Sequence, residues 1–265
     1  MTDSSANGFE PRQLGRTGVM VGPLGVSAGY GLPAAGVERA FEAGMNYVYW
    51  GSWRRPAFGD GIRNLASKRD RMVLVLQSYN PFARGIVHAV EGGLRSLQFE
   101  YADVLLLGMW NRPVPERIRV ACRRLRERDL IRFVAVSTHK RSVIARQARD
   151  PDIDIFHVRY NAVHAGAERD VFPHLPAENP PGIVAFTATN WKQLLDPRRV
   201  PTGERVPTAA DCYRFVLSNP AVHVCLAGPR SSEHLEQAIQ ALAKGPMSGE
   251  ELAWMRRVGQ AIYSK

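Results

Sequence analysis

Eight short apolar segments, each followed by a stretch with helical periodicity, constrain the fold of this chain more than any other feature. The strand-like segments cover residues 24–29, 46–50, 72–77, 103–109, 132–137, 153–160, 182–188 and 222–228. Continuous apolar strands that alternate with helices indicate a parallel sheet covered by helices. Eight such repeats predict an α/β fold, a (β/α)8 barrel of the TIM type.

The segment before the first strand, PRQLGRTGVMVGPLG, predicts a β-hairpin over residues 13–24, with Gly15 and Gly18 as turn residues. We expect this hairpin to close the N-terminal end of the barrel. Residues 11–265 are predicted as one barrel domain and residues 1–10 as a flexible N-terminal tail. Two irregular stretches, PHLPAENPPG and DPRRVPTGERVP, are interpreted as loops of that domain because neither separates two cores.

The chain is basic, with a formal net charge of +10 from 35 lysine and arginine residues against 25 acidic ones. A basic protein can bind nucleic acid, but these arginines are spread along the chain and no nucleic-acid motif accompanies them. The densest run, ERIRVACRRLRER, predicts an amphipathic helix with Ile118, Cys122 and Leu125 on its apolar face and arginines on a solvated face. We expect no nucleic-acid partner, and a phosphate-bearing small ligand or an acidic partner is the alternative.

The three cysteines, Cys122, Cys212 and Cys225, are widely spaced. An odd, scattered set argues against a disulfide framework and for a reducing, cytoplasmic location. No apolar run reaches membrane-spanning length, and the first residues lack the basic and apolar regions of a signal peptide. We therefore expect no membrane partner, and the oligomeric state is left open.

In a (β/α)8 barrel the site lies at the C-terminal ends of the strands. There the sequence places aromatic and neutral polar side chains, but no aspartate or glutamate. Chemistry by paired carboxylates is therefore not expected. No HExxH or CxxC motif occurs, so no metal site is predicted. The strand-end candidates are Tyr30, Tyr49, Trp50, Trp53, Gln77, Tyr79, Met109, Trp110, Asn111, Ser137, Thr138, His139, His157, Tyr160, Asn161, Thr187, Thr189, Trp191, Gly228 and Arg230.

Several segments resemble the aldo-keto reductases, and they follow that family's order across nearly the whole chain. They are QLGRTGVMVGPLGVSAGYG, AFEAGMNYVYW, GGLRSLQFEYADVLLLG, LIRFVAVST, VRYNAV and FVLSNPAVHVCLAGPRSSEHLEQAI. The resemblance implies a barrel opened by a β-hairpin, which agrees with the strands counted independently. It also implies reduction of carbonyl groups with NADPH.

The four catalytic positions of that family are all replaced in this chain. By position, the aspartate falls on Tyr49, the tyrosine near Arg54, the lysine within one position of Gln77 and the histidine on Gly108. In the family the tyrosine gives a proton to the carbonyl oxygen and the lysine lowers its pKa. The segment NYVYWGSWRRP therefore lacks the family's usual proton relay.

The cofactor-binding positions are less altered, and the resemblance implies NADP as the cofactor. The candidates are Ser137, Thr138 and His157 for the nicotinamide carboxamide, Phe186 for its ring, and Gly228, Arg230 and Ser231 for the phosphates. The last group lies in GPRSS, at a helix start where backbone amides can meet a phosphate. Structural roles compete with these assignments: Phe186 as a core residue, Ser137 and Thr138 as helix caps, and Ser231 as an N-cap.

Two hypotheses follow from these residues. In the first, the chain is an NADP(H)-linked oxidoreductase with a non-standard proton donor, for which Tyr49, His139 and His157 are the candidates. Its substrate pocket would be formed by Tyr49, Trp50, Trp53, Gln77 and Trp110. In the second, the barrel is redox-silent and binds an aromatic or apolar ligand, as a scaffold or as a non-redox cyclase, lyase or isomerase. Tyr49 and Trp50 could then simply fill the barrel mouth.

Overall fold

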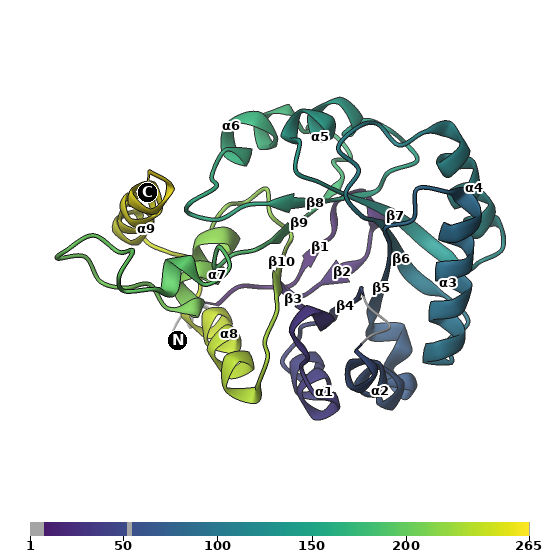
Figure 1. The fold of residues 1–265 in the computed structure, drawn as a ribbon, viewed down its shortest axis with the longest axis horizontal. Coiled ribbons are helices and arrows are strands. Elements are labelled where there is room, and N and C mark those ends of the chain that lie inside the picture. The colour runs from purple at the N-terminus through teal and green to yellow at the C-terminus, as the bar shows by residue number, and fades with distance from the viewer. Residues whose placement is uncertain (1–7, 52–54, 265) are drawn as a thin grey trace, which may run out of the picture.

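Eight parallel strands close into a barrel, as the sequence predicts (Figure 1). The structure is a computed structural model that describes residues 8–51 and 55–264. The strands follow the chain order around the barrel, and the last strand pairs with the first. They are β3 (Leu24–Ser27), β4 (Tyr47–Trp50), β5 (Val73–Ser78), β6 (Ala102–Leu107), β7 (Ile131–Thr138), β8 (Ile155–Arg159), β9 (Gly182–Phe186) and β10 (Val224–Ala227).

Every connection between successive barrel strands contains an α-helix, and two more helices follow β10. They are α1 (Ala34–Glu42), α2 (Pro56–Asn64), α3 (Ala83–Leu97), α4 (Glu116–Glu127), α5 (Arg141–Gln147), α6 (Ala167–Asp170), α7 (Ala209–Leu217), α8 (Ser232–Lys244) and α9 (Gly249–Tyr263). Side-chain caps mark the starts of α7 and α8. Thr208 forms a capping box with Asp211 before α7, and Ser231 accepts a hydrogen bond from the His234 N–H before α8.

Side chains alternate along each strand between the barrel interior and the surrounding helices, because a strand has a period of two. On β4, Tyr47 and Tyr49 belong to the inner cluster, whereas Val48 and Trp50 pack in the outer cluster. The other buried members of the inner cluster are Leu14, Val21, Val73, Val75, Val104, Leu106, Ala135, Ile155, Val184, Val224 and Leu226. This alternation decides which residues at the strand ends can reach the barrel mouth.

The predicted hairpin is present and closes the N-terminal end of the barrel. Strands β1 (Arg12–Gln13) and β2 (Met20–Val21) pair antiparallel. Gly15 is in the left-handed region, with φ of 49°, and a Cβ there would lie 2.3 Å from the backbone nitrogen of Gly182. Leu14 and Val21 are almost fully buried and join the inner cluster. The hairpin thus seals the end of the barrel at which β9 begins.

Helix α4 pairs part of its positive charge within the protein. Arg119 lies 2.8 Å from carboxylate oxygens of both Asp150 and Asp152, and Arg123 and Arg126 pair with Asp152 and Asp154. These aspartates precede β8 in the chain. The expected solvated face of this helix is therefore in part an ion-pair network that fixes α4 to the next repeat.

The first described residues contact the barrel. The Phe9 side chain packs against the outer core, and its N–H donates to the Leu242 carbonyl oxygen at 3.4 Å. Most of the expected tail lies outside the described residues, so the division into a tail and one domain stays a prediction. Across the described residues, none of the helices combines the length and apolarity that crossing a membrane would need.

Candidate active site at the mouth of the barrel

A cavity of about 430 Å³ opens at the C-terminal ends of the barrel strands. This size is within the usual range for small-molecule sites. Each of the eight strands contributes one residue to its lining, namely Ser27, Tyr49, Gln77, Leu106, Ser137, His157, Phe186 and Leu226. Loops and helices add Tyr30, Tyr79, Met109, His139, Thr187, Ala188, Thr189, Trp191, Lys192, Tyr213, Gly228, Arg230 and His234.

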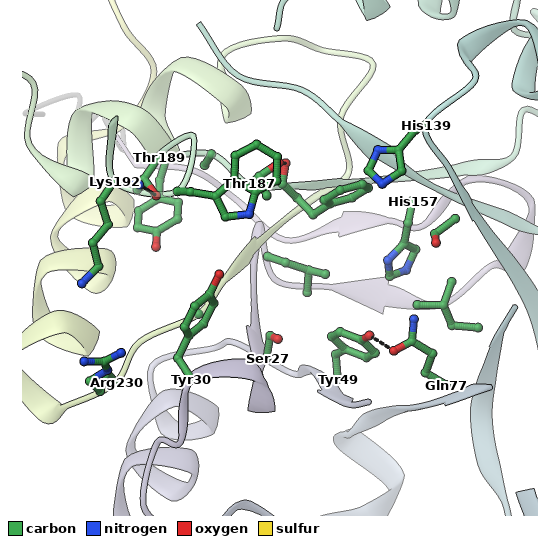
Figure 2. A pocket seen from close by; sticks show the side chains of 18 of the residues that line it. Ser27, Tyr30, Tyr49, Gln77, His139, His157, Thr187, Thr189, Lys192 and Arg230 are labelled. Atoms are coloured by element: carbon green, nitrogen blue, oxygen red, sulfur yellow. Dashed lines mark hydrogen bonds between the residues drawn. The ribbon is translucent and has the colours of Figure 1, made fainter. Parts of the chain in front are cut away.

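Tyr49 and Gln77 form a hydrogen-bonded pair in the cavity (Figure 2). The Tyr49 hydroxyl donates to Oε1 of Gln77. Burial raises the pKa of Tyr49 far above its usual value, and the neighbouring Tyr79 raises it further. The phenol is therefore protonated across the working pH range. A Cβ on Gly108 would lie 2.6 Å from the Tyr79 ring and 2.8 Å from Nε2 of Gln77, so Tyr79 and Gln77 already fill the space beside Gly108.

His157 lies beside this pair and is almost completely buried. Its Nε2 is 2.8 Å from the hydroxyl of Tyr47, and its ring meets the Tyr49 ring edge-on at 6.1 Å between centroids. Burial lowers the pKa of His157 to about 3. The imidazole is thus neutral at physiological pH and serves as a hydrogen-bonding group rather than as a cation.

Charge is distributed unevenly around the cavity. In Figure 2, Lys192 and Arg230 lie toward one end, and Tyr49, Gln77 and His157 toward the other. Among the described residues no aspartate or glutamate lines the cavity, and neither cation forms an ion pair with any of them. The cavity therefore suits a ligand with an anionic end and a neutral polar end.

The loop after β9 adopts a backbone conformation that most residues avoid. Thr187, Asn190, Trp191 and Lys192 have φ between 47° and 71°, and this region is unusual for a β-branched residue such as Thr187. Two donors converge on the Thr187 carbonyl oxygen: Nδ2 of Asn161 at 2.8 Å and the Asn190 N–H at 2.9 Å. Strained backbone clusters at functional sites, and three of these four residues line the cavity.

His139 and Phe186 stand together on the rim. Their rings meet edge-on, with 6.0 Å between centroids. Burial, and then the positive charge of Arg159, lower the pKa of His139. His139 is therefore less protonated at neutral pH than an ordinary histidine, and Phe186 presents an aromatic ring to the cavity.

The structure brings many of the predicted site residues together. Those given a catalytic, cofactor or pocket role that line the cavity are Tyr49, Gln77, Ser137, His139, His157, Phe186, Gly228 and Arg230. Six further strand-end candidates also line it, namely Tyr30, Tyr79, Met109, Thr187, Thr189 and Trp191. All of them come from strands and connections around the barrel mouth that are far apart in the sequence. The cavity thus lies at the C-terminal strand ends, where the barrel rule places a site.

Two predicted pocket residues lie elsewhere. Trp50 and Trp110 are 5% and 6% exposed, pack in the outer core and are not among the residues that line this cavity. The reason for Trp50 is strand alternation, because its neighbour Tyr49 takes the inward position. Trp53 and Arg54 lie outside the described residues.

Two predicted cofactor residues also stand outside the cavity lining. Thr138 faces outward next to the inward Ser137, and its hydroxyl donates to Oδ1 of Asn111 at 3.0 Å. Ser231 caps α8 with its side chain, which is the structural role that competed with phosphate binding. Both residues therefore have local partners that account for their side chains.

Several lining residues were missed by the sequence reasoning. They are Ser27, Leu106, Ala188, Lys192, Tyr213, Leu226 and His234. Strict alternation along each strand could have found Ser27, Leu106 and Leu226, since each occupies an inward position. Tyr213 and His234 come from helices α7 and α8, and their approach to the mouth depends on how those helices pack.

Solved structures with a similar fold are aldo-keto reductases. The holo form of aldo-keto reductase AKR11C1 from Bacillus halodurans matches with a TM-score of 0.79 and 19% identity, over 96% of this chain and 97% of that one. Its apo form matches with a TM-score of 0.75 and 22% identity over the same shares. A Klebsiella pneumoniae aldo/keto reductase in complex with NADP and acetate gives 0.75 and 22%, over 93% of this chain and 94% of that one.

No protein-family model matches the chain, and no curated protein matches it. The likeness to solved structures, at these identities, shows that the chain has the fold of the aldo-keto reductases.

Proposed function

We propose that this protein is an NADP(H)-linked oxidoreductase that interconverts carbonyls and alcohols, with Tyr49 as its proton donor. The observation that carries the proposal is the two-ended cavity. Lys192 and Arg230 provide positive charge at one end, and Tyr49 and His157 provide neutral hydrogen-bonding groups at the other. A nicotinamide dinucleotide with a carbonyl substrate has the matching pattern. One structural neighbour is a holo form and another is a complex with NADP.

The residues at the cationic end fit a phosphate group. Arg230 can offer a forked pair of N–H donors, and Lys192 adds a mobile ammonium. Gly228 allows close approach of the backbone, although the ring of Tyr30 now covers it: a Cβ on Gly228 would lie 2.5 Å from that ring. Tyr30 is 47% exposed and has room to turn outward, so we infer that it moves when the phosphates bind.

At the other end, Phe186 would pack against the nicotinamide ring, with Ser137 and His157 near its carboxamide. When bound, NADPH supplies the hydride that reduces the carbonyl carbon. The protein must then provide a proton for the carbonyl oxygen. Tyr49 keeps its phenolic proton because its pKa is raised, and to use it the hydroxyl must exchange Gln77 for the substrate oxygen as hydrogen-bond partner.

This arrangement predicts a slow reductase. A general acid works best when its pKa is near the working pH. Tyr49 departs from this condition, since no lysine or arginine of the described residues lowers its pKa. A positioned proton donor contributes about 10²–10⁴-fold, so a poorly matched one slows reduction without preventing it. The exposed rings of Tyr79 and Trp191 beside the cavity favour aromatic or apolar carbonyl substrates.

The Tyr49–Gln77 pair also supports a second candidate function. A barrel without redox activity has no need for a cation that lowers the pKa of the phenol, and here the phenol has a raised pKa and a glutamine as its partner. In that case the cavity would bind an aromatic or apolar ligand, as a scaffold or as a non-redox cyclase, lyase or isomerase.

A single-turnover experiment separates the two candidates. The protein is held in excess over NADPH, and the loss of NADPH absorbance is followed with a panel of aromatic and apolar carbonyls. We expect a slow loss that requires the carbonyl and slows further in Tyr49→Phe. No carbonyl-dependent loss, although NADPH binds, would favour the non-redox candidate.

A further inference from the structure

We propose that Tyr47 fixes His157 in the tautomer with its proton on Nδ1, so that the floor of the cavity presents one neutral N–H donor to an acceptor oxygen of the ligand. Tyr47 is then a positioning residue that acts through His157. The structural part of this inference is independent of the reaction. Its use in holding a carbonyl or carboxamide oxygen rests on the proposed function.

Tyr47 is fully buried in the inner cluster, at the start of β4. Its hydroxyl lies 2.8 Å from Nε2 of His157, and no other described residue forms a hydrogen bond with it. The phenol proton therefore has a single acceptor within the described protein, which is Nε2.

The neutral imidazole of His157 carries one proton, on Nε2 or on Nδ1. If Nε2 carried it, the ring would donate to the Tyr47 oxygen, and the phenol proton would be left buried without an acceptor. Leaving a buried donor unsatisfied is disfavoured. A doubly protonated ring is also disfavoured, because burial lowers the pKa of His157 to about 3. The remaining form accepts from Tyr47 at Nε2 and carries its proton on Nδ1.

Nδ1 of His157 has no hydrogen-bond partner within the described protein, and His157 is one of the residues that line the cavity. The ring is next to Ser137, its register partner on β7, whose hydroxyl oxygen accepts from the Met109 N–H at 3.1 Å and makes no hydrogen bond with Nδ1. The Nδ1–H is thus left for a bound molecule, whose matching group must be an acceptor oxygen.

The test is nuclear magnetic resonance of ¹⁵N-histidine-labelled protein without any ligand. Long-range proton–nitrogen correlations distinguish the two neutral tautomers, and His157→Gln assigns the signal. We expect Nδ1 to have the shift of a protonated nitrogen and Nε2 that of an acceptor, unchanged between about pH 5 and about pH 8. A signal from the Nε2–H form, or one that titrates in this range, would overturn the proposal.

Two variants then test the role of Tyr47. In Tyr47→Phe the fixed tautomer should give way to a mixture, whereas Tyr49→Phe, which keeps the ring that touches His157, should leave it unchanged. An unaltered tautomer in a folded Tyr47→Phe protein would also overturn the proposal. The spectrum of the parent protein establishes the tautomer of His157 even if Tyr47→Phe does not fold.

NADPH titration tests the use of the donor. We expect Tyr47→Phe and His157→Leu each to weaken NADPH binding by about 3- to 10-fold, the usual worth of one hydrogen bond, and His157→Gln to restore part of it through its amide N–H. An NADPH affinity equal to that of the parent in both Tyr47→Phe and His157→Leu would refute the ligand role. A parent protein that binds no NADPH would refute the proposed function, and the tautomer would still be decided by the spectra.

Discussion

The hydroxyl of Tyr49 donates its hydrogen bond to the side-chain carbonyl of Gln77, at the point where β4 and β5 reach the cavity. This pair joins a phenol to a neutral acceptor. An acceptor holds the phenol proton in place, whereas a cation would favour its release. Because its proton is held in this way, Tyr49 is expected to be a weak acid and the protein a slow reductase.

Replacement of Tyr49 by phenylalanine tests its role as proton donor. In Tyr49→Phe we expect kcat for carbonyl reduction to fall by about 10²-fold, the lower end of what a general acid contributes, because the raised pKa makes Tyr49 a poorly matched acid. The Kd for NADPH should stay within about twofold of the parent, because the ring itself is kept. Parental kcat in this variant would show that the proton comes from another group, with His139 as the next candidate.

Acid should destabilise the protein through its buried histidines. Burial lowers the pKa of His157 to about 3; burial, and then Arg12, lower that of His223 to about 4. In the unfolded chain both histidines have a pKa of about 6.5. Below that value the unfolded state binds more protons than the folded state, so the free energy of unfolding falls as pH decreases toward the folded values.

Urea unfolding at about pH 7 and about pH 4.5 measures this effect. The loss of stability on acidification should be smaller in His157→Gln than in the parent. This comparison also removes the contribution of Asp154, whose pKa is raised by burial and which acts in the opposite direction. An equal loss in the parent and in His157→Gln would show that His157 does not cause the acid sensitivity.

Two tryptophans should respond differently to alanine substitution. Trp50 packs in the outer core at 5% exposure, whereas Trp191 lines the cavity at 53% exposure. Trp50→Ala should therefore lower the free energy of unfolding by about 3–5 kcal/mol, and Trp191→Ala by less than about 1 kcal/mol. Ligand affinity should change mainly in Trp191→Ala. The reverse pattern would place Trp50 in the site after all.

The fold was predictable because its signals are local and repeated. The apolar runs define the strands, and Thr208 and Ser231 mark two helix starts, so eight repeats were enough to imply the closed barrel. The site was predictable only as a set of strand ends. Trp50 and Tyr49 are equally aromatic neighbours, and the inward side chain is decided by register with β5, where Tyr49 pairs with Val75.

Other parts of the site depend on contacts that the sequence does not encode locally. Tyr47 and His157 are 110 positions apart and meet only across the closed barrel. Lys192 reaches the cavity because its backbone is left-handed, with φ of 71°. A glycine at this position would have indicated that conformation in the sequence, but the residue is a lysine. Tyr30 covers Gly228 from a short helix after β3. Each of these relationships is set by tertiary packing.

The central claim is that the cationic end of the cavity holds the phosphates of NADP(H), and an NADPH titration of four proteins tests it most directly. The parent is compared with Arg230→Ala, Lys192→Ala and a control, Arg117→Ala, which removes an exposed arginine of α4 away from the cavity. Calorimetry at low and high salt gives the affinities. We predict that the parent binds NADPH and that each cavity variant binds about tenfold more weakly, with a smaller difference at high salt, while the control matches the parent. Clear binding by the parent with unchanged affinity in both cavity variants, or no binding by the parent at millimolar NADPH, would contradict the claim.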